Sequence, residues 1–145
     1  DVVNIGAAGT FVVRRPPART VLRAAFARAL PFETHVMMCE GREILSLGAA
    51  DPFRGVRAGA DVVCFVSVLS SARRRPPRLP ATIPEQGPWS VRLLGTRGRF
   101  AFGVYRRQMR AIRDLGRLDT VLGAPVTTRN WNTMLAIGRV LREVG

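Results

Sequence analysis

The chain of 145 residues has no lysine, one histidine and two cysteines, and these small numbers exclude whole classes of site. A zinc centre needs about four nitrogen or sulfur ligands, so His35, Cys39 and Cys64 are too few for a metal cage. No apolar run approaches the roughly 18 residues that a membrane-spanning helix requires. We therefore expect a cytoplasmic protein that does not enter a membrane and has no metal or other cofactor. Its two cysteines are expected to be reduced core residues.

Groups suited to catalysis are equally scarce. Asp114 and Asp119 are five residues apart, so their side chains do not share a helix face. Glu40 and Glu43 flank a predicted helix start, where the helix dipole favours carboxylates in any case. The histidine, His35, lies in an apolar segment, and no glycine-rich phosphate loop is present. The sequence therefore offers no candidate catalytic residue.

Arginine is the residue that the chain has in excess. Twenty-three arginines face ten acidic residues, which gives a formal net charge of +13 and an isoelectric point near 11.8. Such a surface attracts polyanions, and the planar guanidinium group suits bidentate contacts with phosphate. A GC-rich genome also encodes arginine in place of lysine, so the composition alone leaves both explanations open.

The first third of the chain predicts a β-hairpin, a helix, a strand and a short second helix. Residues 2–14 form two extended runs around a glycine-bearing turn. A helix begins at Thr20 and is stopped by Pro31, and the alternation of residues 32–39 predicts a strand buried on both faces. The short helix ends near Gly48. The apolar face of the first helix consists of Leu22, Ala25, Phe26, Ala29 and Leu30.

Residues 61–69 form a β-branched run that predicts a central strand. The proline- and arginine-rich residues 70–88 predict a loop, and a second hairpin with its turn at residues 95–98 begins at Trp89. This loop adds a cluster of positive charge at Arg73, Arg74, Arg75 and Arg78.

Helical periodicity returns over residues 105–122, where Gly116 marks a point of division and Gly123 a C-cap. The residues expected to face inward are Met109, Ile112, Leu115, Leu118 and Leu122. On one continuous helix the opposite face forms a basic stripe of Arg106, Arg110, Arg113 and Arg117. The stripe is either a polyanion-binding surface or the ordinary solvated face of an amphipathic helix.

The motif "TTRNWNT" at residues 127–133 precedes a final amphipathic helix that carries Met134, Ile137, Leu141 and Val144. Two explanations of the motif stay open. Asn130 is a suitable N-cap for this helix. Alternatively, the polar side chains surround free backbone N–H groups at the positive end of the helix dipole, which makes them a candidate anion-binding site. The residues of that site are Thr128, Arg129, Asn130 and Asn132.

Three segments, "GAAGTFVV", "GVYRRQ" and "LGAPVTTRNWNTMLAI", resemble the bacterial domain of unknown function 1697 family, and the Thr-Arg-Asn-Trp-Asn-Thr signature is the most specific part. The resemblance implies a ferredoxin-like half of β-α-β-β-α-β order, followed by a smaller α+β half. In that scheme a first strand and helix lie upstream of Asp1. The chain departs from the family at Ala8, Gly9 and Thr10, where Ser-Gly-Asn is usual. The resemblance implies no reaction.

We therefore predict an α+β protein that forms one compact unit. Residues 1–40 supply an incomplete ferredoxin-like half, made of hairpin, helix and strand, and residues 41–145 supply the second half. The function predicted is non-catalytic binding of an anionic partner, nucleic acid above all, with low specificity. One alternative is a small-anion or nucleotide pocket at residues 128–133 with enzymatic activity. The other is a protein-interaction module, with a partner strand or a second copy at an open sheet edge.

Overall fold

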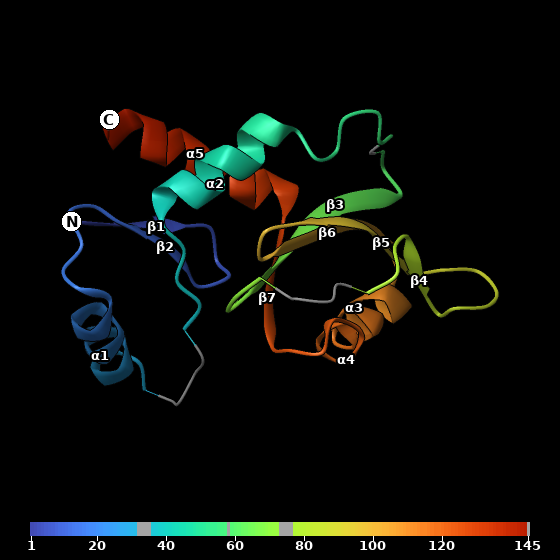
Figure 1. Ribbon diagram of the computed structural model, residues 1–145, viewed down its shortest axis with the longest axis horizontal. Helices are drawn as coiled ribbons and strands as arrows, with labels where there is room; N and C mark the ends of the chain where they lie inside the picture. Colours follow the sequence, from blue (N-terminus) through green and yellow to red (C-terminus); the bar gives the residue numbers. More distant parts are fainter. Residues whose placement is uncertain (32–35, 58, 73–76, 145) are drawn as a thin grey trace.

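The computed structural model describes residues 1–31, 36–57, 59–72 and 77–144, and it confirms the α+β class (Figure 1). In this part of the chain, β1 and β2 form a two-stranded sheet, and a five-stranded antiparallel sheet has the order β4-β5-β6-β3-β7. No described helix has both the length and the apolar character needed to cross a membrane. The elements are β1 (Val2–Ile5), β2 (Thr10–Val13), α1 (Arg19–Ala29), α2 (Gly41–Ala50), β3 (Val62–Leu69), β4 (Ala81–Ile83), β5 (Val91–Arg97), β6 (Phe100–Arg106), α3 (Met109–Leu115), α4 (Leu118–Leu122), β7 (Val126–Asn130) and α5 (Trp131–Val144).

Strand β3 is an interior strand of the larger sheet, as the sequence predicts, because it pairs with β6 on one side and with the edge strand β7 on the other. Phe65 and Val66 are both fully buried and point to opposite faces of the sheet, since neighbouring residues of a strand alternate. Val66 packs in a cluster with residues of α2 and α5, whereas Phe65 packs with Leu118 and Leu122 of α4. The sheet is therefore the middle layer between two layers of helix (Figure 1).

The β5–β6 hairpin is confirmed, but its turn lies later than residues 95–98. Arg97 pairs with Phe100, so the turn consists of Gly98 and Arg99, and Gly98 has the positive φ of 58° that tight turns favour. The register shifts between Leu93 and Gly95, and just before this shift the β5 backbone lies close to Gly103 of β6. A Cβ at Gly103 would lie 2.2 Å from the carbonyl oxygen of Arg92, so this position requires glycine.

The strand predicted at residues 32–39 is wrong for residues 36–39, which form no strand, and residues 32–35 lie outside the described chain. The carbonyl oxygen of Val36 accepts a hydrogen bond of 2.8 Å from Arg23, and that of Met38 accepts one from Arg99. The backbone carbonyl groups of Val36 and Met38 are therefore bonded to arginine side chains and not to a neighbouring strand. The apolar alternation of residues 36–39 reflects partial burial without sheet pairing. The ferredoxin-like detail of the first half is not confirmed, and the boundary at residue 40 stays a prediction.

Two further segments differ from the prediction. The expected loop at residues 70–88 contains β4, which pairs with β5 and buries Ile83. The single helix over residues 105–122 is wrong at its start, because β6 continues through Arg106 and α3 begins at Met109. Its division at Gly116 is confirmed, and Gly123 is the predicted left-handed C-cap, with φ of 70°.

The first hairpin and α1 are confirmed, but they are packed much less tightly than the rest. No residue of α1 is buried, and the Phe26 ring lies 5.7 Å from that of Phe11 on β2. Val21 and Val2 remain more than half exposed, at 53% and 56%. Helix α5 contacts β1 and β2 as well as β3, so it joins the small sheet to the large one. A partner strand or second copy at this hairpin stays a prediction.

The close approach at Gly103 generates the first testable prediction. We expect Gly103→Ala to lower the free energy of unfolding by about 2 kcal/mol or more, because the new methyl group has backbone atoms on the facing strand as its neighbours. Urea unfolding followed by circular dichroism measures this change. The control is Gly48→Ala on α2, where a Cβ would meet nothing within 4 Å, and this variant should equal or exceed the parent in stability. Equal stability of both variants would contradict the close approach.

Candidate nucleic-acid interface

The motif at residues 127–133 divides between strand and helix. Residues up to Asn130 complete β7, which the sequence does not predict, and α5 starts at Trp131. The Asn130 Oδ1 atom accepts hydrogen bonds of 2.9 Å from the backbone N–H and from the hydroxyl of Thr133, which confirms it as the N-cap. The Trp131 ring meets Phe53 edge-on at 5.1 Å, so α5 is anchored to the core at its first residue.

Arg129 of β7 is hydrogen-bonded to the first hairpin, and we call this set of hydrogen bonds the clasp. Its Nε donates to Thr10 Oγ1 at 2.7 Å, and its two Nη atoms donate to the carbonyl oxygens of Ala8 at 2.7 Å and Thr128 at 2.8 Å. Burial lowers the pKa of the Arg129 guanidinium. The side chain therefore connects the first hairpin to β7, and each of its three nitrogen atoms donates a hydrogen bond within the protein.

The other members of the predicted anion site do not converge with Arg129. The Thr128 hydroxyl is 2.6 Å from that of Ser67 on β3, where the two strands pair. Asn130 is occupied as the cap, and the exposed Asn132 side chain forms no hydrogen bond with a described residue. The motif is thus explained by capping, strand pairing and the clasp, and in the described chain it forms no shared donor set.

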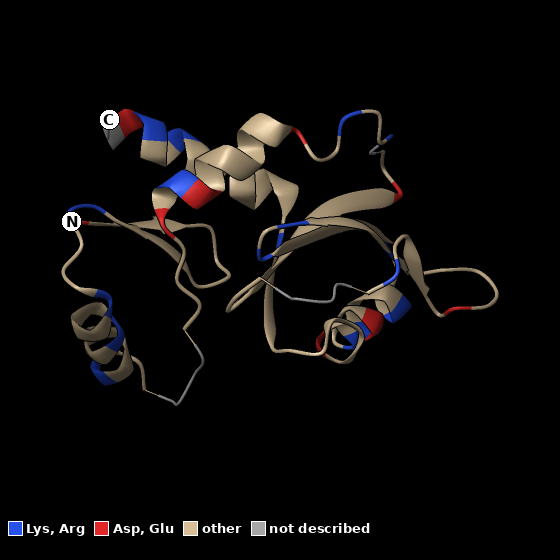
Figure 2. Cartoon of the chain, in the orientation of Figure 1, with Lys and Arg blue, Asp and Glu red and all other residues tan. Residues whose placement is uncertain are grey.

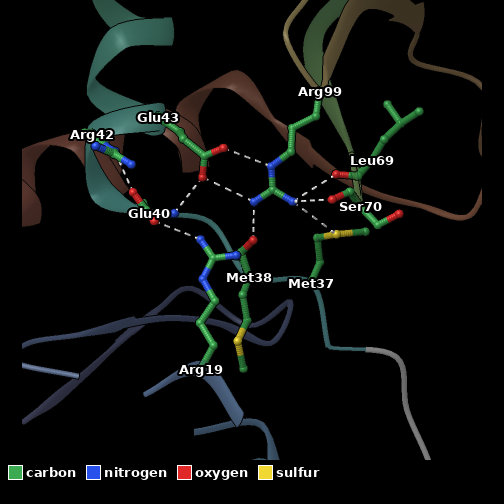
Figure 3. Close-up of polar contacts among 9 residues, drawn as sticks. All are labelled: Arg19, Met37, Met38, Glu40, Arg42, Glu43, Leu69, Ser70 and Arg99. Carbon is green, nitrogen blue, oxygen red and sulfur yellow. Dashed lines mark hydrogen bonds and ion pairs between the residues drawn. The ribbon is translucent and has the colours of Figure 1, made fainter. Parts of the chain in front are cut away.

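A second arginine, Arg99, holds a larger junction that the sequence did not reveal (Figure 3). Its Nε and Nη2 atoms bind the two carboxylate oxygens of Glu43 at 3.1 and 3.3 Å. Its Nη1 donates to the carbonyl oxygens of Leu69 and Ser70 at 3.1 and 3.2 Å, and Nη2 also donates to that of Met38. Because the side chain is only 11% exposed, this residue joins α2, the end of β3, the β5–β6 turn and residues 36–40 in one place.

Glu43 is the acidic partner in that junction and also part of a capping box with Glu40. Burial raises the pKa of Glu43, but the Glu40 backbone N–H, the Arg99 hydrogen bond and the charges of Arg99 and Arg19 outweigh it, so the pKa lies below its usual 4.5. Glu40 in turn pairs with Arg19 at 3.2 Å and Arg42 at 2.5 Å. These acids are therefore neutralised by arginines of the scaffold.

The predicted basic stripe is wrong as a single helix face. Arg106 ends β6, Arg110 and Arg113 lie on α3, and Arg117 follows Gly116 between α3 and α4. Arg106 lies over the Trp89 ring at 4.1 Å and donates from Nε to the Trp89 carbonyl oxygen at 2.9 Å. This guanidinium is held against the protein.

The exposed arginines around α3 form the surface that we call the α3 surface, which consists of Arg107, Arg110, Arg113 and Arg117. Arg107, which the prediction omitted, is exposed just beyond the end of β6, and only its position in the structure identifies it. Arg110 donates to the Pro88 carbonyl oxygen at 2.8 Å, and Arg113 lies 3.8 Å from Asp114. Arg107 and Arg117 form no ion pair with a described acid. The surface therefore keeps most of its positive charge.

The inward face predicted for residues 105–122 is confirmed at Leu118 and Leu122, which are buried, and Leu115 packs against the same cluster, but it is wrong at the start of α3. Met109 and Ile112, expected to face inward, are 84% and 66% exposed, and Ala111 and Asp114 are buried instead. Asp114 Oδ2 accepts a hydrogen bond of 2.5 Å from the hydroxyl of Ser90, which is itself fully buried. Ala111 and Asp114 therefore form the inward side of α3, and the acid of the helix is turned away from solvent.

Arginine elsewhere is spread over the whole chain, including α1, α2 and α5 (Figure 2). Arg14 and Arg19 pair with Asp1 and Glu40, and Arg23 binds a backbone carbonyl. The loop arginines Arg73, Arg74 and Arg75 lie outside the described residues. Among described positions, residues 107–117 therefore carry four exposed arginines, two of which have no ion-pair or hydrogen-bond partner among the described side chains.

The described residues contain neither a metal-binding cluster nor a thiol with a lowered pKa. No group of three or more histidine, cysteine or acidic side chains could hold a metal ion among these residues, and His35 lies outside them. Burial raises the pKa of both thiols above the usual 9.0, and at Cys39 it outweighs the opposing charge of Arg99. Both thiols are therefore protonated near neutral pH, which disfavours them as nucleophiles.

No protein-family model, no curated protein and no solved structure matches this chain. The resemblance to the domain of unknown function 1697 family therefore stays a prediction that rests on its sequence segments.

The clasp generates the second prediction. We expect Arg129→Ala to lower the free energy of unfolding by about 2 kcal/mol, because it leaves the Thr10 hydroxyl and the Ala8 carbonyl without their charged donor. Amide hydrogen exchange should also accelerate in residues 2–13. The control is Asn132→Ala, which should stay within about 0.5 kcal/mol of the parent. Unchanged exchange in the hairpin of the Arg129 variant would refute the clasp.

The Arg99 junction generates the third prediction, which concerns how the stability of the fold depends on pH. The folded pKa of Glu43 is lowered, so its carboxylate stabilises the fold above about pH 4.5. This contribution disappears as the pH falls through the folded value. Glu43→Gln should therefore melt about 2–4 °C below the parent at pH 7 and lose less of its melting temperature on acidification. Thermal scans between pH 7 and about pH 3 test this, with the exposed Glu85→Gln variant as control. Parallel profiles for parent and Glu43→Gln would show that the junction has no such role.

Proposed function

We propose that this protein is a non-catalytic cytoplasmic binder of nucleic acid, which it holds with low sequence specificity through the α3 surface. The observation that carries the proposal is the grouping of Arg107, Arg110, Arg113 and Arg117 as exposed residues around a helix whose own acid, Asp114, is buried. The formal net charge of +13 supports attraction of a polyanion over several ångströms of solvent.

The internal contacts of these arginines leave them able to bind phosphate. A guanidinium group has five N–H donors, and Arg110 gives one hydrogen bond to the Pro88 carbonyl oxygen. A carbonyl oxygen is neutral, so this bond orients the side chain and leaves its charge intact. The ion pair of Arg113 with Asp114 is long at 3.8 Å, and a pair with one exposed partner is weak.

The acids nearby are too few to balance the surface. Asp61, whose carbonyl oxygen accepts the Arg107 backbone N–H at 2.9 Å, and Asp119 of α4 are both exposed. Together with the buried Asp114, three acids therefore accompany four exposed guanidinium groups in this region of the described chain, and of these acids only Asp114 lies within ion-pair distance of one of the four arginines.

Low specificity follows from the chemistry of the surface. Its charged groups are guanidinium groups that match phosphate oxygens, and the backbone of every nucleic acid presents these in the same way. Recognition of a particular base sequence needs side chains that hydrogen-bond to base edges in a groove, as asparagine and glutamine do. Among residues 106–117 the one such carboxamide belongs to Gln108, at the start of α3.

The fourth prediction tests this function by removing charge in two places. A variant with Arg107, Arg110, Arg113 and Arg117 all replaced by Gln should bind a 20-nucleotide single strand at least about tenfold more weakly at low salt. The slope of log affinity against log salt should fall by about three, because fewer counterions are released. Fluorescence anisotropy over a salt series measures both quantities.

The matched control changes the same number of arginines elsewhere, at Arg15, Arg28, Arg139 and Arg142, which are also exposed. Both variants lose four charges from the formal net charge of +13, so general attraction falls equally. The control should keep most of the affinity. Equal losses in the two variants would show that net charge acts without a defined site, and binding that ignores salt in the parent would refute the function itself.

A further inference from the structure

Two exposed apolar side chains lie on α3, between the arginines of the α3 surface in sequence. Met109 and Ile112 are the most exposed large apolar side chains in the described chain, at 84% and 66%. They are three residues apart on one helix, so they lie next to each other on the same face. We call this pair the α3 ridge.

Arginines border the ridge along the helix. Arg113 is four residues after Met109 and therefore lies on the same face, while Arg110 flanks it. The opposite face carries the fully buried Ala111 and the buried Asp114, so the ridge cannot turn inward without exposing that carboxylate and breaking its hydrogen bond to Ser90. Packing of the opposite helix face thus keeps the side chains of Met109 and Ile112 directed toward solvent.

An apolar ridge between guanidinium groups needs a partner that offers both negative charge and exposed apolar surface. A single-stranded nucleic acid has this combination, because its phosphates lie along one side and its unstacked bases present flat, weakly polar faces. A duplex keeps its base faces stacked and offers an apolar side chain little besides thymine methyl groups. Free phosphate or a base-free polyanion has no apolar surface at all.

We infer that the α3 ridge packs against unstacked bases of a single-stranded nucleic acid while the flanking arginines bind its phosphates. This inference rests on the proposed function and adds to it a preference for single strands. Met109 suits such a contact since an unbranched thioether side chain adapts to differently shaped bases, and the contact is therefore independent of sequence.

The test is a double variant, Met109→Gln with Ile112→Gln, measured by fluorescence anisotropy at one low salt concentration. Three probes are used: a 20-nucleotide thymidine strand, an abasic strand of the same length, and a 20-base-pair duplex. We expect affinity for the thymidine strand to fall about threefold or more, because base contacts contribute measurably to binding of single strands. Affinity for the abasic strand and the duplex should stay within about 1.5-fold, because their contacts are electrostatic.

The matched control is Val21→Gln on α1, an exposed aliphatic residue distant in sequence from the ridge, which should bind all three probes like the parent. Circular dichroism and melting temperature check that the ridge variant is folded. An equal fall on all three probes, or no change on the thymidine strand, would overturn the inference.

Failure of the ridge and failure of the proposed function give different results. If the arginine variant loses nucleic-acid affinity and the ridge variant keeps it, the protein binds through charge alone. The ridge then serves another contact, such as an acidic protein segment, and the inference is wrong while the proposed function stands. If the parent binds none of the three probes at low salt, both are wrong.

Discussion

The burial of β3 on both faces is the constraint on which the rest of the structure depends. An interior strand of a sheet, with Phe65 packed on one side and Val66 on the other, needs a helical layer over each face to exclude water. Helices α2 and α5 form one layer, and α4 with the end of α3 forms the other. The positions of β6 and β7 follow from pairing with β3, and those of α3 and α5 follow because each begins close to the end of one of these strands.

Outside that core, hydrogen bonds from arginine side chains connect segments that apolar packing connects elsewhere in the protein. Arg99 and Arg129 each bridge parts of the chain that are far apart in sequence, and both donate to backbone carbonyl oxygens. A planar group with five donors can satisfy several orphan carbonyls at once, which an ammonium group on a flexible stem does less well. The lightly packed hairpin and residues 36–40 are therefore held by hydrogen bonds to guanidinium groups, and this use of arginine needs no external partner.

The sequence predicts elements well where local pattern and burial agree. The β-branched run of β3 and the Asn130 cap were identified because each depends on neighbouring residues alone. The prediction failed where distant residues decide. Residues 36–39 alternate like a strand, but Arg99 occupies the Met38 carbonyl oxygen from 61 residues away. Asp114 of α3 is bonded to Ser90, 24 residues away, and is buried with Ala111, whereas periodicity predicts Met109 and Ile112 as the inward residues.

The same distinction decides where the charge of this protein is free to act. An arginine that fills an internal role, such as Arg129, cannot be told by sequence from one that faces solvent, so the sequence leaves both the motif "TTRNWNT" and the α3 arginines as candidates. The fold separates them, because β7 carries Arg129 against the first hairpin and the Ser90 contact turns the acid of α3 inward. Turning Asp114 inward has a second effect, since it forces Met109 and Ile112 outward among the arginines. Arg110 and Arg113 thus lie on α3 together with the exposed Met109 and Ile112, while Asp114 is buried, and both proposals made for this helix rest on that arrangement.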